Sequence, residues 1–96
     1  MKATQKSEWG LLSNCNGNPR NKILRLTDNI TVLLNHVWPY EDFEMTIRII
    51  MGDHMFSKKS TLKAADWTAA QTQAENEART WLKYLNTETT DALKNL

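Results

Sequence analysis

A regular stripe of apolar and small side chains between residues 66 and 85 constrains the fold of this chain most strongly. At 100° per residue the stripe covers about 120° of arc, the width of the face that a helix turns toward a core. We therefore predict a helix over 66–85, with Asp66 as its N-cap. The alanines at the middle of the stripe allow a close approach to a partner surface, which favours a sheet beneath the helix. The stripe consists of Trp67, Ala70, Ala74, Ala78, Trp81, Leu82 and Leu85.

A second pattern, strict alternation of apolar and polar residues, runs from 43 to 51. On a helical wheel these apolar residues scatter around the axis, so the alternation favours a strand. Pro39, the acidic residues at 41 and 42, and Gly52 also suit the start and end of a helix, which is the alternative. If 43–51 is a strand, Gly52 and Asp53 form a tight turn and 54–56 returns as an antiparallel partner.

Residues 19–38 support two interpretations. Apolar residues at three- and four-residue steps, after an Asn18-Pro19 pair suited to a helix start, favour one helix. The many middling or poor helix formers from Thr27 to Val32 argue against it. We prefer a strand over 22–27 followed by a helix over 28–37 capped by Thr27. Pro39 ends any such helix, because it removes a donor and restricts the residue before it.

The remaining segments complete a small α+β fold in this interpretation. Residues 7–13 suit an edge strand before a turn at 16–19, and 87–96 suit a further short helix. The expected architecture is an antiparallel sheet of three or four strands, packed against the long C-terminal helix, with a shorter helix before Pro39. The 96 residues contain no repeat and no linker, so we expect 1–96 to form a single domain.

Composition excludes several classes of protein. The formal net charge is +1, which gives no overall basic character of the kind that nucleic-acid-binding domains show. No apolar run approaches the length of a membrane span, and the cationic start is not followed by the apolar segment of a secretory signal. The single cysteine, Cys15, rules out an intrachain disulfide. We therefore expect a cytoplasmic protein.

No arrangement of reactive residues points to catalysis. The three glycines are widely spaced, so neither a dinucleotide fingerprint nor a phosphate-binding loop is present. The chain has two histidines and one cysteine in no zinc-binding spacing, and we predict neither a metal nor another cofactor. Cys15 with His36 or His54 is the remaining nucleophilic combination, and an unreactive thiol in a turn is the simpler interpretation. We expect no enzyme.

Charge and aromatic residues point instead to binding. Residues 1–40 carry five basic and two acidic side chains, whereas 41–56 carry four acidic and one basic. Segregated charges steer association with a partner of opposite pattern. A Trp-Pro-Tyr corner at 38–40 offers aromatic side chains of the kind that dominate interfaces, although core packing of Trp38 is the competing interpretation. The predicted binding residues are Trp38, Tyr40, Glu41, Asp42, Lys58, Lys59 and Lys63.

The resulting hypothesis is a non-catalytic accessory or inhibitor protein that occludes a macromolecular partner. A compact chain without motifs is typical of such proteins in bacteriophages and other mobile elements, where the partner is a host or phage protein or a ribonucleoprotein complex. The alternative is a small nucleic-acid-binding regulator that contacts phosphates through a loop containing Lys58, Lys59 and Lys63, with Phe56 and Trp38 as stacking residues. The sequence does not indicate an oligomeric state.

Overall fold

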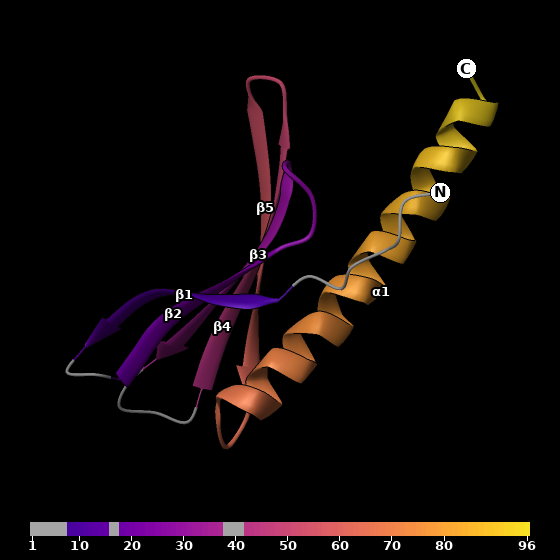
Figure 1. The fold of residues 1–96 in the computed structure, drawn as a ribbon. Coiled ribbons are helices and arrows are strands. Elements are labelled where there is room, and N and C mark those ends of the chain that lie inside the picture. Colours follow the sequence, from indigo (N-terminus) through magenta and orange to yellow (C-terminus); the bar gives the residue numbers. More distant parts are fainter. Residues whose placement is uncertain (1–7, 16–17, 38–41) are drawn as a thin grey trace, which may run out of the picture.

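The computed structural model describes residues 8–15, 18–37 and 42–96, which form an antiparallel sheet and one long helix (Figure 1). The sheet has five strands in the order β1-β2-β3-β4-β5, so each strand pairs with the next one along the chain. An α+β architecture with an antiparallel sheet is thereby confirmed, with five strands in place of the expected three or four. The strands are β1 (Trp9–Cys15), β2 (Asn18–Arg25), β3 (Ile30–Val37), β4 (Asp42–Met51) and β5 (His54–Lys63).

Helix α1 (Trp67–Lys94) follows the sheet and crosses one of its faces (Figure 1). The predicted N-cap is confirmed, because the Asp66 side chain accepts a hydrogen bond of 2.8 Å from the backbone N–H of Ala69. The helix does not end near 85 as predicted but continues through the segment expected to form a separate short helix. At about 1.5 Å per residue, its 28 residues reach about 42 Å, more than the sheet can cover.

The core lies between α1 and the face of the sheet that the helix covers. The predicted alanine stripe supplies the helix side, and Ala70, Ala74 and Ala78 are all buried. Gln71, the one polar residue within the stripe, accepts a 2.9 Å hydrogen bond from Lys22 Nζ at the margin of the core. The sheet contributes large side chains in alternation, as the pattern of 43–51 predicted. They are Leu24, Val32, Leu34, Phe43, Met45, Ile47 and Leu62.

The prediction of a helix before Pro39 is wrong, because residues 30–37 form strand β3. Val32 and Leu34 are fully buried between the neighbouring strands and α1. Residues two apart point to the same face of a strand, whereas in a helix they would point in different directions and would not both face the core. Thr27 does perform capping chemistry, since its Oγ1 accepts hydrogen bonds from the N–H groups of Asn29 and Ile30 at 3.1 and 3.0 Å. Those bonds close the turn between β2 and β3 rather than starting a helix.

The other sequence predictions for the sheet are confirmed, with longer strands. Gly52 and Asp53 form a two-residue turn, and Gly52 has the left-handed φ of 59° that such hairpins require. The returning strand, predicted over 54–56, extends through Lys63 as β5. Residues 57–63 therefore form a strand and not the loop of the nucleic-acid hypothesis. The N-terminal edge strand is present as β1.

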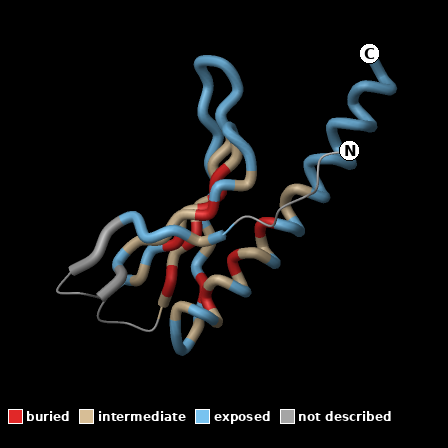
Figure 2. The backbone as a smooth tube through the Cα atoms, in the orientation of Figure 1, coloured by how far each residue is buried: buried red, intermediate tan, exposed pale blue. Residues whose placement is uncertain are grey.

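Two parts of the structure extend beyond the core. In Figure 1 the end of the β4–β5 hairpin and the C-terminal half of α1 point away from the packed layers and diverge from each other. Figure 2 shows both as continuous exposed segments, and every residue from 51 to 59 and from 83 to 96 is exposed. The exposed apolar side chains there include Met51, Met55 and Phe56 on the hairpin and Leu85 and Leu93 on the helix.

Candidate functional site

The sheet has two faces of different character. One face packs against α1, as shown by the contact of Phe43 with Trp67, whose ring centroids lie 5.0 Å apart. Because side chains alternate along each strand, the neighbours of Phe43 in β4 point to the opposite side. We call that side the open face; no element that the structure describes packs over it. Its residues in β4 and β5 include Asp42, Glu44, Thr46, Arg48, Ser57, Lys59 and Lys63.

A shallow groove of about 300 Å³ lies on the open face. Antiparallel register brings its polar side chains together: Asn35 stands opposite Glu44, and Arg48 stands opposite Ser57. Apolar side chains complete it, so the groove combines hydrogen-bonding groups with a hydrophobic floor. The side chains around it are those of Leu12, Asn21, Leu33, Asn35, Glu44, Thr46, Arg48, Met55, Ser57 and Lys59.

Arg48 is the most informative residue of the open-face groove. Its Nε atom is buried, and no hydrogen-bond acceptor for it is present among the described residues. Most buried donors in proteins are paired, and an unpaired one costs about 1–3 kcal/mol. Arginine guanidinium groups pair with carboxylate and carbonyl oxygens, and the Arg48 side chain would have to turn outward before such a group from outside the chain could reach its buried Nε.

Charges of both signs alternate across the open face. Lys59 Nζ lies 3.8 Å from Glu44 Oε1, with the two side chains 69% and 40% exposed. Exposed pairs of this kind contribute little to stability, so both charges remain available to a partner. Two residues before Glu44 in β4, Asp42 stands directly opposite Lys63 of β5 in the register. The predicted binding residues Asp42, Lys59 and Lys63 therefore share one surface.

Lys58 does not belong to that surface. It is adjacent to Lys59 in a strand and therefore points to the opposite face, where its Nζ lies 4.4 Å from the ring centroid of Trp81. The three lysines do not form one basic patch, because strand geometry divides them in a way that a loop would not. Of the other predicted binding residues, Trp38, Tyr40 and Glu41 lie outside the described residues.

Of the reactive side chains considered from the sequence, His54 belongs to one end of the sheet, whereas Cys15 and His36 belong to the other end, on strands that β2 separates. The ring of His36 packs between Phe43 and Trp67, at centroid distances of 4.6 and 6.2 Å, on the face that the helix covers. His54 stands at the tip of the β4–β5 hairpin. Cys15 pairs with Asn18 at the other end of the sheet. The register thus separates Cys15 from His54 by the length of the strands.

Within residues 8–15, 18–37 and 42–96, no three histidine, cysteine or acidic residues gather closely enough to hold a metal ion. No helix in those ranges has the length and apolar character needed to cross a membrane.

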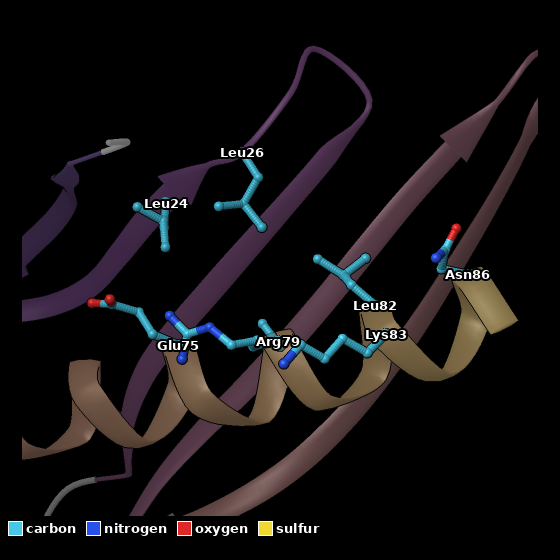
Figure 3. A pocket seen from close by; sticks show the side chains of 8 residues that line it. Leu24, Leu26, Glu75, Arg79, Leu82, Lys83 and Asn86 are labelled. Carbon is cyan, nitrogen blue, oxygen red and sulfur yellow. The ribbon is translucent and has the colours of Figure 1, made fainter. Parts of the chain in front are cut away.

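A second hollow, which we call the helix pocket, lies where α1 begins to leave the sheet (Figure 3). It measures about 400 Å³ and has an apolar floor formed by Leu24, Leu26, Ala78 and Leu82. Longer polar side chains, those of Glu75, Arg79, Lys83 and Asn86, surround the floor. In Figure 3 Leu24 and Leu26 descend from the sheet toward the helix, and Leu82 points toward them from the opposite side.

Sequence reasoning missed several members of the open-face groove. The alternation of β4 was recognised, so Arg48 could have been grouped with Glu44 on the exposed side. Asn21 and Asn35 could not, because the second half of the 19–38 segment was interpreted as a helix. Only the pairing of β2 with β3 and of β3 with β4 brings these amides beside Glu44, into the groove that Arg48 also lines.

Comparisons of the chain with protein-family models, with curated proteins and with solved structures gave no significant match.

Proposed function

We propose that this protein binds and occludes a protein partner through the open face of its sheet, without catalysing a reaction on it. The observation that carries the proposal is the buried Nε of Arg48, which has no acceptor among the described residues and lies in a groove that no described element covers. A carboxylate or backbone carbonyl of the partner would complete that hydrogen bond once the Arg48 side chain turns outward. Met55 and Leu33 supply apolar contact beside it.

The distribution of charge favours a protein over a nucleic acid as the partner. A phosphate backbone is uniformly negative and would be repelled by Asp42 and Glu44, which alternate with the lysines. Base stacking requires aromatic rings beside the cations. Among the described residues the sheet's rings occupy the other side: Phe43 packs on Trp67, and Trp9 donates a 2.9 Å hydrogen bond to Glu75 of α1. A mixed-charge surface is the kind that selects a complementary protein.

Affinity capture from a nuclease-treated extract of the native host tests this proposal. The wild-type chain is compared with a variant that carries Arg48→Met and Lys59→Ala, which removes both cations and retains the aliphatic stem at 48. We expect a defined protein to be enriched at least tenfold by the wild type and lost with the variant. Far-ultraviolet circular dichroism verifies that the variant is folded.

A matched variant, Lys83→Ala with Lys94→Ala, removes two cations from the exposed part of α1 and should capture the same protein as the wild type. Titration of the purified partner at two salt concentrations then measures Kd directly. Equal capture by the wild type and the Arg48 variant would contradict the proposal. Recovery of nucleic acid alone from an extract without nuclease, with a steep salt dependence, would instead favour the nucleic-acid regulator.

A further inference from the structure

The C-terminal half of α1 carries an apolar stripe that nothing described in this chain covers. Leu82 is half-buried against the core, but Leu85 and Leu93 are 37% and 70% exposed. On a wheel of 100° per residue, Leu82, Leu85, Thr89 and Leu93 lie within about 80° of arc. This is the same side of the helix that turns Ala74 and Ala78 to the sheet. The core-facing stripe therefore continues past the end of the core.

The order of residues in this stripe is symmetric. The steps between Leu82, Leu85, Thr89, Leu93 and Leu96 are three, four, four and three residues, so the pattern reads the same in both directions from Thr89. A twofold axis at Thr89 would place an identical helix antiparallel to the first. Leu85 of each copy would then face Leu93 of the other, and Leu82 would face Leu96. A stripe built for an unrelated partner has no need of this symmetry.

The helix pocket lies at the position where the end of an antiparallel second helix would arrive. Leu82, which the symmetry sets against Leu96 of a second copy, is one of the residues that form the pocket floor. Leu96 is 98% exposed, and Figure 3 shows Leu24 and Leu26 facing Leu82 across the space that a leucine side chain would enter. The apolar floor and the polar side chains around it suit a leucine that follows the C-cap Asn95 at the end of a second copy of α1.

The chain exposes more surface than a compact monomer of its size, and the C-terminal half of α1 is one of the exposed parts. The chain exposes 7463 Å², whereas a compact monomer of 11.1 kDa is expected to expose about 5,700 Å². Its radius of gyration of 15.1 Å also exceeds the value of about 12.5 Å typical of this length. The excess area, on the order of 1,800 Å², belongs to the chain as a whole and is shared between the β4–β5 hairpin, the C-terminal half of α1 and other exposed segments, whereas a standard interface buries about 800 Å² on each partner. Described side chains that are more than half exposed, including Tyr84 and Leu93, contribute to it.

We propose that this protein forms a twofold homodimer in which the C-terminal halves of α1 pair antiparallel about Thr89. Each helix packs Leu85 against Leu93 of the second copy and inserts Leu96 into its helix pocket. The open face lies on the other side of the sheet from α1, so the dimer presents two open faces. The pairing is independent of the proposed partner surface and of the residues that form it.

Sedimentation equilibrium at 5–200 µM protein tests the dimer. We expect the wild type to sediment at twice 11.1 kDa at the higher concentrations, and a variant with Leu85→Asp and Leu93→Asp to dissociate at least 100-fold more readily. The matched control, Thr80→Asp with Thr87→Asp, adds the same charge to exposed positions on the opposite side of the helix and should remain dimeric. A monomeric wild type at 200 µM, or equal dissociation of both variants, would overturn the proposal.

A cross-linking experiment checks the geometry without disturbing the leucines. In a Cys15→Ser background, Thr89→Cys places a thiol at the twofold axis, and mild oxidation should link most of the protein as a disulfide dimer. Thr87→Cys, on the opposite side of the helix, should link poorly. Equal linking at both positions would contradict the antiparallel pairing. The Arg48 and Lys59 variant should cross-link normally at 89, so that loss of the protein partner and loss of the dimer are measured separately.

Discussion

The two halves of α1 lie in different environments and differ in composition, with four alanines and two tryptophans in 67–82 against one alanine and no tryptophan in 83–94. Residues 67–82 lie on the sheet, and Ala70 and Ala74 are fully buried there. Residues 83–94 continue the same helix and the same apolar stripe, and every one of them is exposed. A helical segment of this length is marginal in water by itself. The comparison shows that a stripe indicates a face to be covered and does not indicate which molecule covers it.

Amide hydrogen exchange should show the largest difference between the halves. In dilute monomeric protein, amides of 70–82 exchange through opening of the core, whereas those of 84–94 exchange through local fraying. We expect the second set to exchange about 100-fold faster or more. The measurement is residue-resolved exchange by nuclear magnetic resonance at two concentrations. The difference should shrink at the higher concentration if the helices pair, and equal protection of both halves in the monomer would refute the comparison.

Enlarging an alanine of the stripe should also change the free energy of unfolding by different amounts in the two halves of α1. Ala74→Leu places a large side chain where Ala74 is completely buried, and we expect a loss of about 2 kcal/mol in the free energy of unfolding. Ala92→Leu makes the same change on the same side of the exposed half and should cost less than about 0.5 kcal/mol. Urea titration of dilute protein measures both. A large loss for Ala92→Leu would mean that 83–94 packs against the core.

Removing the capping side chain should affect the free energy of unfolding differently at the two ends of α1, although the expected difference is smaller than for the alanines. Asp66→Ala removes the 2.8 Å hydrogen bond to the N–H of Ala69 at the end that is anchored to the sheet. We expect a loss of about 1 kcal/mol in the free energy of unfolding. Asn95→Ala, at the C-cap of the exposed half, should leave this free energy unchanged because that end does not unfold with the core. Thermal unfolding followed by circular dichroism compares the two, and equal shifts in Tm would argue against the contrast.

The smallest expected difference in stability is between alanine substitutions of two threonines, one in each half of α1. Thr72 and Thr89 both donate from Oγ1 to the backbone carbonyl four residues earlier, at 3.2 and 2.7 Å. Replacement of Thr72 by alanine should raise the free energy of unfolding by about 0.5 kcal/mol, because alanine has the higher helix propensity. Thr89→Ala should raise only the helix content of the exposed half. A gain in global stability from Thr89→Ala in the monomer would show that the halves unfold together.

The accuracy of the sequence predictions depended on how far the deciding contacts lie along the chain. The α1 stripe and the β4 alternation were recognised because each pattern is local and contains its own period. Residues 30–37 were misinterpreted because Val32 and Leu34 are selected by strands on both sides, β2 and β4. Thr27 misled the prediction because the same side-chain acceptor can cap a helix or close a turn.

The candidate site was only partly accessible to the same reasoning. Asp42, Lys59 and Lys63 were identified by charge and do share the open face. Lys58 was grouped with them because a loop was expected, and the alternation of β5 places it on Trp81 instead. The groove around Arg48 draws on all five strands, so no single segment of sequence could indicate it.

Local periodicity by itself determined that this chain would build a long amphipathic helix, a strand over 43–51 and a hairpin turn at Gly52, because each depends on neighbours a few residues away. The tertiary structure decided the number of strands, the division of the lysines between two faces and the point at which α1 leaves the sheet. Those outcomes depend on register between distant segments, and a register is set by packing energy summed over the whole core rather than by any one stretch of residues.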